Sequence, residues 1–566
     1  MLHARGPLLS LDAGERTARR VDVDGALAAY VGGRGLNTRL LAGRAPADAD
    51  PLGPENRVYF STGPLQQSTM SFTGRMAATA YSPLTGGVAS SNAGGFLSRN
   101  FAGTGAAAVE VHGASDEPLA VHVREGPDGP EATFEAVPEL ELATVPEVTA
   151  WAEREHDLGA EHTACVGPAG ENEVRFASVM TTESRAFGRG GLGAALGAKG
   201  VKLLTFDGDH DHGIDVDDEA VAIHRDAATS DSIMKRQGTA SVTDLANEIG
   251  SFPSYYFDDV RFEGYESING DAVEAKKYEK GTCSQCAFAC KLPTRDEATG
   301  LETEGPEFET IMAFGGNCGV DDVVDVMKGN DICDRLGMDT ISAGNTVAAY
   351  LASEDAFGDA DLVHETTRKI AYREGVGDRL AEGIDRVHDE LGVENWTVKG
   401  MSFSAHDGRT LNGQGLGFAV ANRGADHMYA TFYAWEYPLV DDSEAYDPSG
   451  LAEAKVETLV EQENLRAVED CGVVCRFSRG EMTPGRFEAL FETDYEAIQA
   501  LGARVVELER HLNNERGFDR SDDRVPYDLP GFAAALDRYY ESRGWSADGV
   551  APDPTAATGG AAPADD

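Results

Sequence analysis

Three cysteines lie close together near the middle of the chain. Cys283, Cys286 and Cys290 follow the pattern CxxCxxxC. On a helical or turn-rich segment, this spacing directs three thiols to one side, with neighbouring Cβ atoms about 5–6 Å apart. That arrangement suits a cubane iron–sulfur cluster, which needs four thiolates, commonly three local and one remote. A zinc site, which usually pairs two short CxxC knuckles, and unliganded thiols are the alternatives.

A fourth thiolate has to come from one of the other five cysteines. Cys333 falls inside a helical pattern, and Cys165 and Cys318 lie near glycines, so buried, unliganded thiols are expected at all three. Cys471 and Cys475 remain, and their spacing does not choose between them. Eight cysteines in 566 residues are too few for a disulfide scaffold. Their clustering therefore indicates ligands.

Two short segments share one layout, DRLGMDT at Asp334–Thr340 and DCGVVC at Asp470–Cys475. In the first, Gly337 is expected to end one helix and Asp339 to cap the next. Such a junction exposes backbone N–H groups beside a carboxylate and could hold a heterocycle that has both donors and acceptors. An ordinary helix–turn–helix is the alternative for each copy.

Glycine-rich loops are concentrated before residue 205, several of them with an arginine nearby. They include Gly74-Arg75, Ser91–Gly95 and Gly188–Gly193. Backbone N–H groups in loops of this kind can cradle phosphates. None of them has the Walker A order, and the last lacks the GxGxxG register of a dinucleotide site. They are candidate anion sites.

Hydrophobic periodicity divides the chain into two parts. Before about residue 205, apolar and polar residues alternate as in strands, with a hairpin over Leu8–Leu27. From about Asp215 onward, apolar residues recur every three to four positions, as in helices. Helical patterns are expected over Val216–Gly250, Val320–Leu336, Thr340–Ser353, Leu362–Leu391, Ala452–Ala467 and Tyr495–Asn514.

The charge balance excludes some partners. There are 97 acidic and 48 basic residues, a formal net charge of −49, which disfavours nucleic acid. So acidic a surface is expected in a protein adapted to a salty cytoplasm, because salt screens its self-repulsion. An acidic protein from a GC-rich genome is the alternative. No apolar stretch reaches membrane-spanning length, and the first residues lack a signal-peptide core, so a cytoplasmic protein is expected.

Taken together, these residues resemble the aldehyde ferredoxin oxidoreductase family, whose enzymes carry tungsten on a bispyranopterin. Besides the cysteine triad and the two Asp motifs, the matching segments are GGRGLNTRLL at Gly32–Leu41, TGRMAATAYSPLTGG at Thr73–Gly87, GRGGLGAALGAKGVK at Gly188–Lys202, GPEFET at Gly305–Thr310, RGADH at Arg423–His427 and YYESRGW at Tyr539–Trp545. They occur in the family's order and extend almost from end to end.

The resemblance implies an α+β multidomain fold. A β-rich N-terminal domain that binds the bispterin would cover residues 1–206. Two mainly α-helical domains would follow, over residues 207–398 with the cysteine triad and residues 399–545 with the fourth cysteine. Residues 546–566, built mostly from Ala, Pro, Gly, Asp and Thr, are expected to form a disordered tail.

The resemblance also implies a set of cofactor ligands. The cluster would be [4Fe–4S], with Cys475 as the fourth ligand and Cys471 as the spare thiol. The two pterins of a tungsten (or molybdenum) bispyranopterin would be held by Asp334, Gly337, Met338, Asp339, Asp470 and Val474. A Mg²⁺ ion between the pterin phosphates would be bound by carbonyls of Asn92 and Gly190. Arg75 and Arg189 would lie close to this anionic centre.

Two further residues match those that line the family's metal pocket, Glu309 in GPEFET and His427 in RGADH. His427 could donate a hydrogen bond to an aldehyde oxygen, and a desolvated Glu309 could accept a proton from water. His406, nearby in the sequence, is expected to be structural. Val473 stands where the second pterin motif normally has glycine, so the backbone there can differ. Lys328 replaces a carboxylate that binds a bridging iron in some dimeric members, so a homodimer would lack that iron.

The implied reaction is oxidation of a small aldehyde to a carboxylic acid, with ferredoxin as the electron acceptor. A relative that runs another low-potential reaction, such as reduction of an aromatic acyl-CoA thioester, is one alternative. A non-enzymatic iron–sulfur electron-transfer protein is the other, and it would need the cysteines but not Glu309, His427 or the paired motifs.

Overall fold

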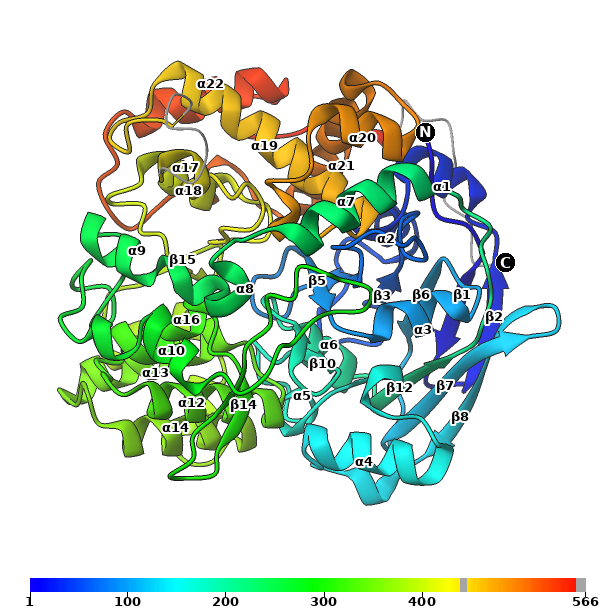
Figure 1. The fold of residues 1–566 in the computed structure, drawn as a ribbon, viewed down its shortest axis with the longest axis horizontal. Helices are drawn as coiled ribbons and strands as arrows, with labels where there is room; N and C mark the ends of the chain where they lie inside the picture. The colour runs from blue at the N-terminus through cyan, green and yellow to red at the C-terminus, as the bar shows by residue number, and fades with distance from the viewer. Residues whose placement is uncertain (438–444, 556–566) are drawn as a thin grey trace.

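The computed structural model describes residues 1–437 and 445–555. Its N-terminal region begins with a six-stranded sheet (Figure 1, blue). In sheet order, the strands are β2 (Thr17–Val21), β1 (Leu8–Asp12), β6 (Ala108–His112), β3 (Val58–Ser61), β4 (Arg75–Tyr81) and β5 (Val88–Gly94). The predicted N-terminal hairpin is confirmed, because β1 and β2 pair antiparallel with Asp12 opposite Thr17.

A second six-stranded sheet packs against the first. Its order is β11 (Arg185–Phe187), β10 (Val179–Thr181), β9 (Thr163–Cys165), β12 (Val201–Asp207), β7 (Leu119–Gly126) and β8 (Gly129–Ala136). Apolar side chains from both sheets form one core, in which the rings of Phe60 and Phe187 meet edge-on with centroids 5.6 Å apart. Nearly all residues of β3, β4, β5 and β12 are buried, so these strands are covered on both faces. Further hydrophobic cores cover the other face of each sheet.

Short helices complete this region: α1 (Asp24–Tyr30), α2 (Gly33–Arg44), α3 (Leu97–Gly103), α4 (Val145–His156), α5 (Pro168–Glu171) and α6 (Leu192–Gly197). The periodicity of the sequence does not reveal α2. Its residues from Gly33 to Leu41 are all buried, including Arg34 and Arg39, so the helix has no contrasting polar face.

Most helices of the first half of the C-terminal region surround one hydrophobic core (Figure 1, green). The helices of this half are α7 (Asp217–Thr229), α8 (Met234–Gln237), α9 (Thr243–Ile249), α10 (Gly270–Lys276), α11 (Phe308–Thr310), α12 (Val323–Leu336), α13 (Thr340–Glu354), α14 (Ala360–Tyr372), α15 (Val376–Leu380) and α16 (Ile384–Leu391). Of these, α7 packs instead into the core of the last part of the chain. The pattern predicted over 362–391 is split into three helices, because Gly375 and Gly383 adopt positive φ and interrupt it.

The last part of the chain packs around another core (Figure 1, yellow to red). Its helices are α17 (Asn412–Val420), α18 (Tyr433–Glu436), α19 (Glu453–Gly472), α20 (Pro484–Phe491), α21 (Tyr495–Glu515) and α22 (Phe532–Arg543). The predicted fold class, a β-rich N-terminal domain followed by a mainly helical region, is confirmed. Among the described residues, no helix combines the length and apolar character needed to cross a membrane.

Two short hairpins lie in the helical region, β13 (Pro293–Arg295) with β14 (Glu302–Glu304) and β15 (Thr397–Val398) with β16 (Met401–Ser402). The predicted boundary between residues 398 and 399 falls within the second hairpin, and the division into two helical domains stays a prediction.

The start of the predicted tail is ordered, in contrast to the expectation. Arg510 donates a hydrogen bond to the carbonyl of Gly549 at 2.7 Å, and the Ala551 N–H donates to Asn514 at 2.9 Å. These two hydrogen bonds satisfy backbone groups of the segment and hold residues 549–551 against α21. Composition alone does not reveal such contacts. Residues 556–566 lie outside the described part of the chain.

Candidate active site

The four predicted cluster cysteines line one small cavity. Cys283, Cys286 and Cys290 lie on a turn-rich loop between α10 and β13, and Cys475 approaches from just beyond α19. The loop is bound to the N-terminal region, since the Ser284 N–H donates to the carbonyl of Gly95 at 2.9 Å. All four thiols are free. Four converging thiols of this kind can bind a metal ion or a metal–sulfur cluster.

Charges around this cavity favour ionisation at one thiol. Burial raises the pKa of Cys286 and Cys290. Burial also opposes ionisation of Cys283, but nearby cations, above all Lys291 and Arg185, outweigh it and lower the pKa of that thiol. Because the thiolate is the form that binds metals, Lys291 and Arg185 favour metal binding by Cys283.

The other cysteines are packed elsewhere. Cys471 is fully buried against α2, where a Cβ atom added to Gly35 would lie 2.8 Å from its Sγ. Cys165, Cys318 and Cys333 are each buried in hydrophobic cores. The expectation that these three thiols are buried is therefore confirmed, and that they bind no metal stays a prediction. The structure brings Cys475, not Cys471, to the cysteine triad.

The two Asp motifs have the same backbone geometry at equivalent positions. After α12, Gly337 adopts the left-handed conformation with φ 79° and ψ 54°. After α19, Val473 adopts it with φ 57° and ψ 39°. Each lies three residues after the motif's Asp, so valine does not change the turn here. This conformation is strained for a β-branched residue, and full burial of Val473 helps to hold it.

The first motif is anchored on the N-terminal domain. As predicted, Asp339 caps α13, and its side chain accepts a hydrogen bond from the Ser342 N–H at 2.9 Å. Gly337 accepts a backbone bond from Ser178, and buried Met338 bridges to Ala177. These contacts place the helix junction beside the residues that lead into β10 of the second sheet.

Asp334 is half-buried and has an unusual acidity. Burial raises its pKa from 3.8 to about 8, against the opposing effect of Arg185. Asn330 donates a hydrogen bond to it at 3.0 Å. The carboxyl group is therefore largely protonated at neutral pH and can donate as well as accept a hydrogen bond.

A cavity of about 180 Å³ adjoins the cysteines and is rich in arginine. Its lining comprises Arg75, Ser90, Ser91, Asn92, Gly188, Arg189, Arg423, Met428, Tyr429, Asp470, Val474 and Arg476. Four guanidinium groups against one carboxylate suit a strongly anionic ligand. Arg75 also lines the cysteine cavity, so the two sites share a wall.

Several polar atoms around this cavity are buried without a hydrogen-bond partner. They include Nδ2 of Asn92, Nε and Nη1 of Arg189 and Nε of Arg423. Buried donors are normally satisfied, so unpaired donors at a cavity wall are the expected mark of a bound acceptor. The donors present thus fit a ligand that carries phosphate-like groups.

Of the predicted cofactor residues, Arg75, Asn92, Arg189, Asp470 and Val474 line this cavity. Arg189 Nε lies 3.6 Å from Asp339, and this contact connects the first Asp motif to the cavity. The remaining predicted residues, Gly190, Asp334, Gly337 and Met338, are not among its lining residues. The carbonyls of Asn92 and Gly190 already accept bonds from Arg75 and Ser82, so each retains one lone pair for a cation.

Glu309, His406 and His427 form a buried cluster beside the arginine cavity. Glu309 lies on α11, which continues into a π-helical turn. His427 Nε2 lies 3.3 Å and His406 Nε2 3.7 Å from Glu309 Oε1. The next two residues after His427, Met428 and Tyr429, line the cavity.

The two oxygens of Glu309 have different surroundings. Oε2 accepts a hydrogen bond from the Ala405 N–H at 2.7 Å, whereas Oε1 is buried and accepts none. His427 Nδ1 is likewise buried without a hydrogen-bond partner. One oxygen thus positions the carboxylate and the other is available to accept a proton, so the pair can perform acid–base chemistry.

His406 belongs to this cluster, although its sequence suggests only a structural role. Its ring stacks on Tyr433 with centroids 3.6 Å apart, and its Nδ1 lies 3.0 Å from the Tyr437 hydroxyl. Burial, and secondarily His427, lower its pKa well below the ordinary value, so the ring is neutral. His406 and His427 are 21 residues apart, so no local sequence pattern predicts that they meet. Arg423, within the RGADH segment, and Arg476, directly after the second Asp motif, are also cavity residues, and no binding role was predicted for either from the sequence.

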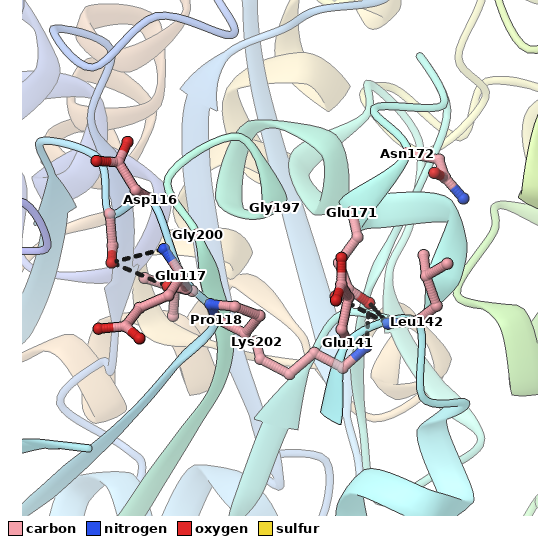
Figure 2. A pocket seen from close by; sticks show the side chains of 12 residues that line it. Asp116, Glu117, Pro118, Glu141, Leu142, Glu171, Asn172, Gly197, Gly200 and Lys202 are labelled. Atoms are coloured by element: carbon pink, nitrogen blue, oxygen red, sulfur yellow. Dashed lines mark hydrogen bonds and ion pairs between the residues drawn. The ribbon is translucent and has the colours of Figure 1, made fainter. Parts of the chain in front are cut away.

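Another polar cavity, of about 240 Å³, lies where β12 begins in the second sheet (Figure 2). Lys202 in its wall is already paired with Glu171 and donates to the carbonyl of Ala143 at 2.8 Å. Its remaining charged lining residues are acidic. Anionic ligands are therefore disfavoured there, and none of the predicted site residues contributes to it.

Comparisons with known proteins cover almost the whole chain. Residues 8–208 match the model for the N-terminal domain of aldehyde ferredoxin oxidoreductase, and residues 217–558 match the model for its domains 2 and 3. The tungsten-containing aldehyde ferredoxin oxidoreductase of Pyrococcus furiosus is 31% identical over 92% of this chain and 93% of its own. That of Thermococcus kodakarensis is 30% identical with the same coverage.

One solved structure is similar in fold. The active-site complex BamBC of benzoyl coenzyme A reductase, in complex with 1,5-dienoyl-CoA, superimposes with a TM-score of 0.82. The likeness covers 98% of this chain and 97% of that chain at 20% sequence identity. At this identity, the likeness concerns the fold alone.

Proposed function

The chain belongs to the aldehyde ferredoxin oxidoreductase family and is an enzyme of that type, and on this premise we propose that it oxidises small aldehydes to carboxylic acids with ferredoxin as the electron acceptor. The observation that carries the proposal is the approach of His427 to the unpartnered oxygen of Glu309 at 3.3 Å. This pair lies beside a cavity that suits an anionic cofactor.

We assign a [4Fe–4S] cluster to Cys283, Cys286, Cys290 and Cys475. Their convergence on one cavity and the cations near Cys283 support this assignment. Zinc is less well matched, since the fourth cysteine comes from a distant helix end and not from a second short knuckle.

We assign the arginine-lined cavity to a tungsten (or molybdenum) bispyranopterin. Arg75, Arg189, Asp470 and Val474 would contact it directly, and its anionic groups would pair with the unpartnered donors described above. The other residues assigned to it are Asp334, Gly337, Met338 and Asp339. The cavity is smaller than the roughly 300–1,000 Å³ of ordinary ligand sites, so we expect lining side chains to move outward on binding.

We also assign a Mg²⁺ ion to the phosphate groups of this cofactor, with the carbonyls of Asn92 and Gly190 as ligands. Carbonyl oxygens and phosphates are the hard ligands that Mg²⁺ prefers. The lone pair that each carbonyl retains supports the assignment.

When bound, the two redox groups supply the removal of two electrons from the substrate and their transfer one at a time to ferredoxin. The chain's own residues supply the proton chemistry. His427 would donate a hydrogen bond to the aldehyde oxygen, where negative charge develops as water adds. Glu309 Oε1 would accept the proton released by that water, while the bond from Ala405 to Oε2 keeps the carboxylate oriented.

The stacked, neutral His406 would fix one side of this pocket. It contacts Glu309 and stands between Tyr433 and Tyr437, so water has little room to approach from that side. Exclusion of bulk water strengthens the electrostatic interactions within the pocket.

Ferredoxins have to reach the cluster side of this acidic chain. We propose that salt screens the repulsion between the two proteins, since a net charge of −49 would otherwise slow association with an acidic partner. A homodimer, if formed, would lack a bridging iron because Lys328 is a cation.

Anaerobic purification followed by metal quantification and an aldehyde-dependent assay of dye reduction tests the function. Tungsten or molybdenum together with about four irons per chain, and dye reduction with simple aldehydes, is the expected result. Iron without either heavy metal would indicate an electron-transfer protein. A fully metallated protein that oxidises no aldehyde but reduces an aromatic acyl-CoA would indicate the alternative reaction.

The role of Glu309 has its own test. Glu309→Gln removes the base but keeps the size of the side chain, so kcat should fall by about 10²–10⁴-fold with metal content unchanged. Glu302→Gln, at the exposed first position of β14, is the matched control and should retain wild-type turnover. Equal turnover of the wild type and Glu309→Gln would remove Glu309 from the mechanism.

A further inference from the structure

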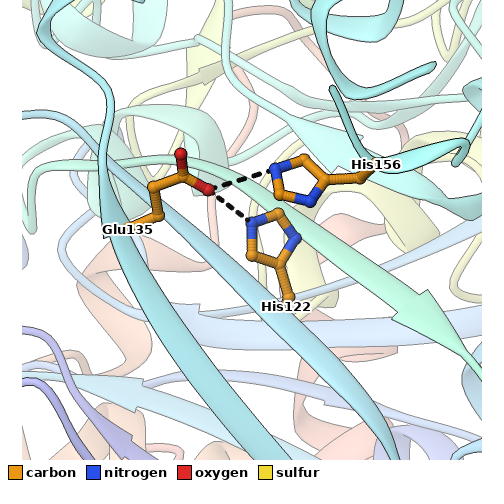
Figure 3. Close-up of side chains that lie close together, drawn as sticks. All are labelled: His122, Glu135 and His156. Atoms are coloured by element: carbon orange, nitrogen blue, oxygen red, sulfur yellow. Dashed lines mark ion pairs between the residues drawn. The ribbon is translucent and has the colours of Figure 1, made fainter. Parts of the chain in front are cut away.

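A cluster of two histidines and one glutamate lies in the N-terminal domain, in the second sheet. His122 on β7 and Glu135 on β8 occupy the same face of one hairpin, because Ala120 pairs with Glu135 and His122 with Thr133. His156 is the last residue of α4, which packs over that face through Trp151. Figure 3 shows both imidazole rings directed at one carboxylate.

The three side chains converge on a single point. His122 Nε2 lies 3.4 Å and His156 Nε2 3.1 Å from the same oxygen of Glu135, Oε2. All three ligand atoms lie within 4.8 Å of one another. Around a tetrahedral zinc ion with bonds of about 2.0–2.1 Å, ligand atoms are about 3.3 Å apart. The two measured separations are therefore close to those of a metal site.

Hydrogen bonding leaves the ligand atoms available. Nε2 of His122 and Nε2 of His156 are buried, and neither has a hydrogen-bond partner of acceptable geometry. Nδ1 of His122 lies 2.8 Å from the hydroxyl of Thr205 on the neighbouring strand β12. If Nδ1 carries the proton in that bond, Nε2 presents its lone pair, as in metal-ligating histidines.

An ion pair alone explains this arrangement less well. The two rings lie with centroids 4.1 Å apart, so two imidazolium ions would repel each other. One shared oxygen would also have to satisfy two buried N–H groups. A divalent cation between the three atoms satisfies all of them at once.

We propose that His122, Glu135 and His156 bind a zinc-class divalent cation, with water as the fourth ligand. The site is open to solvent on the side of Glu135, whose side chain is 45% exposed. It would tie the C-terminal end of α4 to the β7–β8 hairpin. None of its residues belongs to the cofactor site, so the proposal stands apart from the proposed function.

Metal titration of the full-length holoenzyme tests this site. After a chelator wash and equilibration with Zn²⁺, bound zinc is counted in the wild type, in His156→Ala and in Glu135→Gln. The wild type should retain one more zinc per chain than either variant. His162→Ala is the matched control and should retain the wild-type count. His162 lies in the same domain but outside the cluster, with its Nδ1 2.8 Å from the Phe206 carbonyl.

Substitution with cobalt identifies the ligands of the additional metal ion that the wild type retains. Co²⁺ in place of zinc should give visible absorption without the near-ultraviolet thiolate bands that cysteine ligands produce, and Glu135→Gln should lack it. Because the Glu135 side chain is 45% exposed, this variant should keep the fold and the dye-reducing activity. Equal zinc counts in the wild type and both variants, or thiolate bands for the lost equivalent, would overturn the proposal.

Discussion

Arg75 Nη1 lies 3.9 Å from Cys475 Sγ, and the same guanidinium group donates to Asn92 through Nε at 2.6 Å. Arg75 thus stands between the cysteine cavity and the arginine-lined cavity and is the residue that lines both. In the proposed enzyme, this position lies between the cluster and the bispterin. A fixed cation there would stabilise negative charge on either side.

Arg75→Lys should separate charge from geometry. Lysine keeps the positive charge but cannot form the paired contacts to Asn92 and Cys475, so iron content should be retained while aldehyde-dependent turnover falls at least about tenfold. The measurement is iron per chain together with kcat on one preparation. Arg154→Lys on the exposed face of α4 is the control and should behave as the wild type. Unchanged turnover in Arg75→Lys would show that the geometry of this contact is unimportant.

A comparison of two neighbouring cysteines tests the fourth cluster ligand. Cys475→Ala should lose most of the iron and the broad visible absorption of the cluster, because three thiolates hold a cubane poorly. Cys471→Ala should keep both, since that thiol is packed against α2. Iron loss in Cys471→Ala with full iron in Cys475→Ala would reverse the assignment.

Asp334 should make the stability of the cofactor-free chain depend on pH. Its pKa is about 8 in the folded chain and 3.8 ordinarily, so between these values the folded state holds a proton that the unfolded state has lost. Stability therefore falls as pH rises through this window, by up to about 1.4 kcal/mol per pH unit. Asp334→Asn does not titrate. From pH 6 to pH 9, the wild type should lose of order 2 kcal/mol relative to the variant in urea unfolding. Parallel pH profiles would contradict this prediction.

Salt should stabilise the protein. With a net charge of −49, self-repulsion is strong at low ionic strength, and the Debye length falls from about 10 Å at 0.1 M to about 3 Å at 1 M salt. The thermal unfolding midpoint should therefore rise between 0.1 and 2 M KCl. An uncharged osmolyte at equal osmolality is the control and should raise it less. A midpoint that is the same at both KCl concentrations would rule out adaptation to salt.

Local features of this chain were predictable because they depend on neighbours in sequence. The hairpin of β1 and β2, the glycine end of α12 and the cap of α13 by Asp339 all follow from turn and capping preferences within a few residues. The buried helix α2 was not predictable in this way, since it lacks a polar face. The turn at Val473 was only partly predictable. Its place in the motif indicates a left-handed residue, but a β-branched side chain disfavours that conformation, which burial of Val473 helps to hold.

The amino-acid sequence by itself determined the ligand types, the local turns and the change from strands to helices. Spacing along the chain does not choose between Cys471 and Cys475, whereas the tertiary structure brings Cys475 to the cysteine triad and packs Cys471 against α2. It likewise brought His406 to Glu309, across 97 positions, and His122 to His156. The physical reason is that periodicity and capping report on contacts within one element, whereas these contacts arise from packing between elements that are distant along the chain.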